Sequence, residues 1–75
     1  MVAYEVEIVP CLTLTLRQQE ALWLIAHGLG YEGAARTMGL SFHTLKHHCS
    51  DARERLGALD NNHAIYIALK LGLIP

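Results

Sequence analysis

Residues 35–48, with the sequence ARTMGLSFHTLKHH, constrain the fold more than any other part of the chain. Gly39 can adopt the left-handed backbone conformation that ends a helix, and Ser41 is a residue type that caps the start of one. Apolar residues on both sides recur at helical spacing, so one helix ends and another begins within this short stretch. The pattern predicts a helix-turn-helix whose second helix presents polar residues outward.

The same reasoning predicts an all-α domain of four helices. Threonine, serine and aspartate precede the apolar repeats, and glycines follow them, as is typical of helix starts and ends. The expected helices are one capped by Thr13 or Thr15 and ended by Gly28, one over about 31–38, one from Ser41 to Gly57, and one that begins after Asp60.

Each expected helix has an apolar stripe that should form the core. The residues expected to point inward are Leu22, Ile25, Ala26 and Leu29 in the first helix, Ala34, Ala35 and Met38 in the second, Leu45, Cys49, Ala52 and Leu56 in the third, and Ala64, Ile65, Ala68 and Leu69 in the fourth.

Residues 1–12 precede this domain, which we expect to span residues 13–75. Val2, Tyr4, Val6 and Ile8 alternate with less apolar residues, a period of two that predicts a short strand or arm. A single strand cannot satisfy its own backbone hydrogen bonds. The arm should therefore pair with a second copy, lie against the helices, or remain loose.

Composition excludes several classes of protein. Hydrophobic residues make up 52% of the chain and charged residues 17%, which is too apolar for a disordered protein. We find no uninterrupted apolar run of membrane-spanning length and no secretion signal at the start, so a cytoplasmic location is expected. Cys11 and Cys49 should then remain thiols rather than form a disulfide.

The outward row of the third expected helix is the candidate ligand-binding surface. It comprises His43, Lys46, His47, Ser50 and Glu54. The formal net charge of the chain is -1, which is unusual for a protein that binds phosphates. Two of the seven acidic residues lie in the arm, however, and the cations Arg36, Lys46, Arg53 and Arg55 gather around this helix.

Metal binding and catalysis find less support in the residues. His43 and His47 stand four residues apart, as zinc-binding histidines often do, but Cys49 points to the opposite side of the helix. We find no carboxylate pair, no nucleophile beside a base and no phosphate-binding glycine loop. We therefore expect no metal, no cofactor and no enzymatic activity.

Five segments, in this order and at this spacing, resemble the LuxR-type (GerE-type) helix-turn-helix domains of bacterial transcription regulators. They are LTLRQQEAL from Leu14 to Leu22, then Gly28 with Ala35, LSFHTLKHH from Leu40 to His48, RLG from Arg55 to Gly57, and GLI from Gly72 to Ile74. The resemblance implies a bacterial or bacteriophage transcription regulator. Such proteins usually carry an additional N-terminal domain, and we expect this one to stand alone.

The resemblance also implies a ligand and an assembly. The ligand is double-stranded DNA, with the third helix in the major groove. The residues implied to contact DNA are Thr44, Lys46, His47, His48 and Ser50, joined by the nearby Arg36 and Arg53. Regulators of this family often pair through the fourth helix, which here has a second apolar side. The residues expected at a homodimer interface are Tyr66, Ile67 and Leu71, with Tyr4, Val6 and Ile8 of the arm.

The acidic arm, the net charge of -1 and the departure at residues 30–33 favour a different class of function, a protein-binding module. Residues 30–33, GYEG, replace the S-N-K-E segment of the family, so an acid stands where a phosphate-binding lysine is usual. Trp23 falls on the polar side of the first helix, beside Gln19 and His27. Either Trp23 is a single exposed apolar residue, which is common, or the arm or a protein partner covers it. Such a module would bind a full-length regulator or host protein through the arm, Trp23 and the fourth helix.

Overall fold

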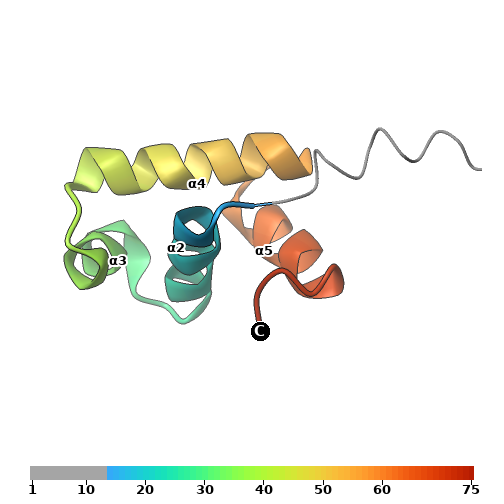
Figure 1. The fold of residues 1–75 in the computed structure, drawn as a ribbon, viewed down its shortest axis with the longest axis horizontal. Helices are drawn as coiled ribbons and strands as arrows, with labels where there is room; N and C mark the ends of the chain where they lie inside the picture. The colour runs from blue at the N-terminus through green and yellow to red at the C-terminus, as the bar shows by residue number, and fades with distance from the viewer. Residues whose placement is uncertain (1–13) are drawn as a thin grey trace, which may run out of the picture.

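The computed structural model describes residues 14–75, which form four α-helices and no strand (Figure 1). The helices are α2 (Leu16–Ala26), α3 (Gly30–Met38), α4 (Phe42–Leu56) and α5 (Asn61–Lys70). The predicted all-α, four-helix class is therefore confirmed. The predicted strand or arm, with Tyr4, Val6 and Ile8, lies outside the described residues.

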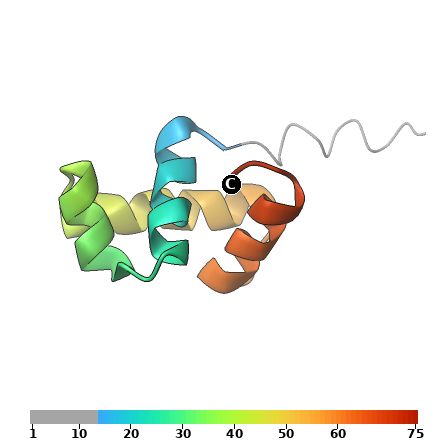
Figure 2. The same cartoon turned by 90° about the horizontal axis from the view of Figure 1, so that it is seen from below.

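Helix α4 is the longest of the four and packs against all of the others. It runs along one side of the molecule, and α2, α3 and α5 lie together on the opposite side (Figure 1). The view from below shows α2 crossing α4 between α3 and α5 (Figure 2). One long side of α4 is thus covered by three helices, and the other faces solvent.

Side-chain caps define where the helices begin. The Thr15 side chain accepts a hydrogen bond from the Gln18 N–H, and the Gln18 side chain accepts one from the Thr15 N–H, which completes a capping box. Ser41 caps α4 through the Thr44 N–H, and Asp60 caps α5 through the His63 N–H. The sequence predicted each of these caps, with Thr15 now chosen over Thr13.

The turn between α3 and α4 depends on Gly39. Its φ of 70° lies in the left-handed region, which favours glycine. The Leu40 N–H donates to the Ala35 carbonyl at 2.9 Å, so the end of α3 closes on itself before α4 begins. The predicted helix-turn-helix geometry is therefore present between α3 and α4.

The core consists of two apolar clusters, and α2 and α4 contribute to both. One cluster joins α2 and α4 to α3, and the other joins them to α5 and the C-terminal residues. The first comprises Ala21, Leu24, Ala34, Ala35, Met38, Leu45 and Cys49, and the second Leu14, Leu22, Ala52, Leu56, Ala64, Ala68 and Ile74. All inward residues predicted for α3 and α4 are buried.

Three predicted core positions are wrong. Ala26 and Leu29 are exposed because α2 ends at Ala26 and the chain turns away, so the helical spacing does not continue to Leu29. Leu69 is 50% exposed because the buried line of α5 follows Ala64 and Ala68. None of the described helices is long and apolar enough to cross a membrane.

Candidate nucleic-acid interface

The solvent-facing side of α4 carries the row of polar residues that the sequence predicted to point outward. His43, Lys46, His47, Ser50 and Glu54 are all exposed, as predicted. We define the α4 face as the first four of them. Leu45 and Cys49 lie directly behind it and are fully buried. The face is therefore held in place by the core rather than carried on a loop.

Ser41 fixes the first turn of α4. Its hydroxyl oxygen accepts from the Thr44 N–H at 3.1 Å, and the hydroxyl donates to Thr44 Oγ1 at 2.9 Å. Thr44 is exposed beside the α4 face, with its own hydroxyl proton still available to a ligand. Thr44, one of the residues that the family resemblance implied to contact DNA, thus lies in the first turn of a capped helix.

An aromatic pair supports Lys46. The Lys46 Nζ lies over the Phe42 ring, 5.4 Å from its centroid, in the range of a cation–π contact. The Phe42 ring in turn meets Tyr31 of α3 edge to face, with centroids 5.9 Å apart. Two helices therefore position this ammonium group.

Arg53, near the C-terminal end of α4, is hydrogen-bonded to a polar side chain of α5. Its Nη1 donates to Asn61 Oδ1 at 2.6 Å, and Asn61 Nδ2 donates to the Tyr31 hydroxyl at 2.8 Å. Arg53 was expected beside the α4 face, and the structure places it there, half-buried and connected to α5 and α3. Tyr31 and Arg53 line a depression of ≈ 260 Å³ together with His43, Lys46, His47 and Ser50.

The remaining predicted DNA contacts differ in their surroundings. His47 Nε2 lies 3.7 Å from Asp51 Oδ2, one helical turn away, so an acid shares this part of the α4 face. His48 is half-buried, and Arg36 is exposed on α3. Within residues 14–75, no three histidine, cysteine or acidic side chains come together as metal ligands.

Cys49 differs in chemistry from the residues of the α4 face. Its thiol is free and buried, and burial raises its pKa from 9.0, partly opposed by the positive charge of Arg53. Burial and a raised pKa both make a thiol unreactive. Cys49 therefore acts as a small apolar core residue beneath the α4 face.

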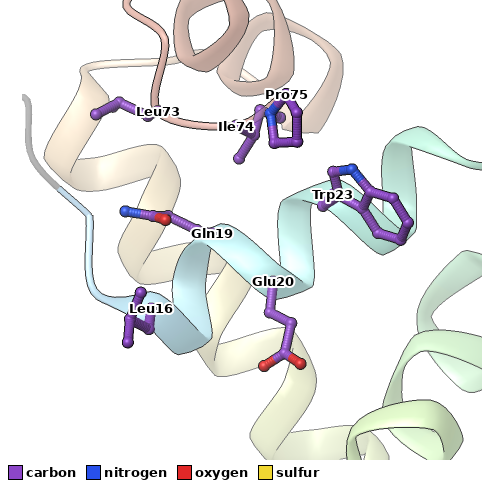
Figure 3. A pocket seen from close by; sticks show the side chains of 7 residues that line it. All are labelled: Leu16, Gln19, Glu20, Trp23, Leu73, Ile74 and Pro75. Atoms are coloured by element: carbon purple, nitrogen blue, oxygen red, sulfur yellow. The ribbon is translucent and has the colours of Figure 1, made fainter.

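A second exposed surface lies between α2 and the C-terminal residues. It is an open, largely apolar groove of ≈ 450 Å³, which we call the Trp23 groove (Figure 3). The α2 side chains form one side of it and the C-terminal residues the other (Figure 3). Its lining residues are Leu16, Gln19, Glu20, Trp23, Leu73, Ile74 and Pro75.

Trp23 is 37% exposed and stacks on His27 with ring centroids 4.0 Å apart. The sequence placed Trp23 beside Gln19 and His27, and this placement is confirmed. The involvement of the C-terminal residues was missed, because nothing in a single sequence tells that Pro75 returns to α2.

The exposed side of α5 differs from the predicted interface. Tyr66 and Leu71 are exposed, as expected, but Ile67 is half-buried against the second apolar cluster. Leu69, predicted to lie in the core, is exposed beside Tyr66 instead. We refer to the exposed apolar residues of α5 and its C-cap, Tyr66, Leu69 and Leu71, as the α5 face.

Sequence reasoning also missed Tyr31, Phe42 and Asn61 beside the α4 face. Their role follows from contacts between residues up to thirty positions apart, as between Tyr31 and Asn61. The polar start of α5, with two asparagines after the Asp60 cap, was a signal that could have indicated a hydrogen-bonding role there.

Comparison with known proteins gives one informative similarity. The chain is 35% identical over 60 residues to the transcriptional activator protein CarR of Pectobacterium carotovorum subsp. carotovorum, a match that covers 80% of this chain. The chain spans a quarter of the length of that relative, 25%. No protein-family model matches the chain, and no solved structure matches it significantly. The similarity supports a LuxR-like helix-turn-helix domain as a distant relationship.

Proposed function

We propose that this chain is a DNA-binding transcription regulator that places α4 in the major groove of double-stranded DNA. The observation that carries the proposal is the α4 face, a row of exposed polar residues fixed by a capped helix start and a buried core. The similarity of the chain to part of a protein named as a transcriptional activator supports the same role. We propose binding, not catalysis, as its activity.

The dimensions of the two surfaces agree with this docking. An α-helix with its side chains is about 10–12 Å wide and the major groove is about 12 Å wide. In helix-turn-helix proteins the N-terminal residues of the second helix meet base edges, which here are His43, Thr44 and His47. Lys46 supplies a positive charge to phosphate or to guanine.

We further propose that two copies pair through the α5 face, which would place two α4 helices on adjacent half-sites. Tyr66, Leu69 and Leu71 are exposed apolar side chains of α5 and its C-cap, and α5 lies at the end of the domain away from α3 (Figure 1). Exposed apolar side chains that gather on one element commonly mark a protein interface.

Duplex binding measured at low and moderate salt tests the DNA proposal. The protein should bind random-sequence duplex in a salt-dependent way, and Lys46→Ala should weaken binding by about 1–3 kcal/mol. Arg17→Gln is the matched control, because it removes a cation on α2 that pairs with Glu20 and belongs to neither the α4 face nor the α5 face. A folded protein that binds no duplex even at low salt would refute the proposal.

Gel filtration with light scattering tests the dimer. Leu69→Glu should give a folded monomer, because the charge would enter an interface that excludes water. Ala68→Glu should instead unfold the chain, since Ala68 is fully buried. A Leu69→Glu protein with unchanged mass in solution would move the interface elsewhere.

The Trp23 groove favours a second candidate function, a module that binds a full-length regulator or host protein. The groove is apolar and adjoins the only tryptophan of the chain. This alternative predicts binding to a protein partner with a change in Trp23 fluorescence, and no loss of that binding in Lys46→Ala.

A further inference from the structure

We propose that Tyr31, Asn61 and Arg53 form a seat for one phosphate of the DNA backbone at the C-terminal end of the α4 face. This inference rests on the proposed DNA-binding function and adds two contributing residues, Tyr31 and Asn61. The three side chains come from α3, α5 and α4, and two hydrogen bonds connect them.

The direction of each hydrogen bond follows from chemistry. Arginine can only donate, so the Asn61 atom that meets Arg53 is the amide oxygen. The Asn61 amide nitrogen then donates to the Tyr31 oxygen. The Tyr31 hydroxyl therefore keeps its own proton, and Arg53 keeps the rest of its N–H groups, to donate to a ligand.

The remaining hydrogen-bond donors of Arg53 and Tyr31 indicate the chemical class of the ligand. An arginine with free N–H groups and a phenol with a free proton suit an anion with several acceptor oxygens, which a phosphodiester provides. Both residues line the depression that also contains Lys46 and Ser50. Asp51 lies in the same region of α4, where its Oδ2 is 3.7 Å from His47 Nε2.

The separation of the two cations fits a helix in the major groove. Lys46 and Arg53 stand seven positions apart on α4, which is two turns or about 10.5 Å along the axis. Lys46 thus lies near the end of α4 that meets bases, and Arg53 near the end that approaches the backbone. Asn61 acts as a positioning residue, because it orients Arg53 and does not itself contact the ligand.

Three substitutions, measured by duplex binding over a range of salt concentrations, test the seat. Arg53→Ala should weaken binding about tenfold and reduce the slope of log affinity against log salt by about 0.9, the loss of one phosphate contact. Tyr31→Phe removes only the hydroxyl and keeps the ring against Phe42. It should weaken binding several-fold with the melting temperature close to that of the wild type.

Asn61→Ala separates positioning from a purely structural role. It should weaken binding in the wild-type background but cause no further loss in Arg53→Ala, because its effect passes through Arg53. Arg17→Gln, which removes a cation on α2 outside the lining of the depression, should leave the salt slope unchanged.

The outcomes separate this inference from the function on which it rests. Binding that Lys46→Ala weakens but that Arg53→Ala and Tyr31→Phe leave unchanged would overturn the seat and keep the DNA-binding function. An Asn61→Ala loss that is equal with and without Arg53 would also overturn it. If the wild type itself shows no salt-dependent binding, the DNA-binding function fails and the seat fails with it.

Discussion

The α4 face and the Trp23 groove are both exposed, but they are built in opposite ways. On the α4 face, Lys46 lies over the Phe42 ring, which contacts Tyr31 of α3, and the neighbouring Arg53 is hydrogen-bonded to Asn61 of α5. In the groove, apolar side chains of α2 lie opposite the C-terminal residues, and Leu16 is 80% exposed. The first surface therefore holds its positive charges in fixed positions. The second exposes apolar side chains, which a partner could bury.

The largest expected difference between the two surfaces is in how much the residues beside them contribute to the free energy of unfolding. Leu45→Ala, directly behind the α4 face, should lower the free energy of unfolding by about 2–5 kcal/mol, because it leaves a cavity in the core. Leu16→Ala, at the rim of the Trp23 groove, should change it by less than about 0.5 kcal/mol. Denaturant unfolding followed by circular dichroism measures both, and equal effects would contradict the comparison.

Removing a negative charge beside the α4 face should affect only that face. Asp51 Oδ2 lies 3.7 Å from His47 Nε2, one helical turn away. Because a carboxylate near a phosphate opposes binding, Asp51→Asn should tighten duplex binding by about threefold to tenfold at low salt. Duplex binding that Asp51→Asn leaves unchanged would exclude contact between this part of the α4 face and phosphate.

Trp23→Ala should affect only the groove. Loss of the Trp23–His27 pair should lower the free energy of unfolding by at least about 1 kcal/mol, since such pairs contribute about 0.5–1.5 kcal/mol beyond the apolar area that they bury. The affinity for duplex DNA should not change. If DNA affinity falls in a folded Trp23→Ala protein, the two surfaces do not act independently.

The smallest expected effect comes from Cys49. Burial raises the pKa of its thiol in the folded protein above 9.0, the ordinary value for a cysteine thiol. The resulting stability is therefore fully present below that pH and is lost as the pH rises through the folded pKa. In a Cys11→Ser background, the melting temperature should fall more steeply above pH 9 than in Cys11→Ser/Cys49→Ala. Parallel pH curves for the two proteins would contradict this.

Local signals in the sequence predicted most of the fold. Caps and glycines act within a few residues, so the starts of α4 and α5 and the turn at Gly39 were readable directly. The inward line of α4 was correct because α4 is long and its pattern covers several turns. Leu29 and Leu69 were misplaced because the apolar spacing alone does not say where a helix ends or how far a short helix is rotated.

The candidate site was predictable only where it depends on one helix. His43, Lys46, His47 and Ser50 follow from the periodicity of α4. The contact of Arg53 with Asn61, and of Asn61 with Tyr31, joins three helices that only folding brings together. The lining of the Trp23 groove by Ile74 and Pro75 depends in the same way on the return of the chain to α2.

The division of α4 between two apolar clusters has a consequence for how the domain opens. Leu45 and Cys49 belong to the cluster with α3, and Ala52 and Leu56 to the cluster with α5. Loss of either α3 or α5 therefore uncovers half of α4 and weakens its contacts with α2 as well. We expect the four helices to unfold as one cooperative unit, with the backbone amides of α4 among the slowest to exchange with solvent. A fragment limited to the helix-turn-helix segment should accordingly fail to hold α4 in a stable form.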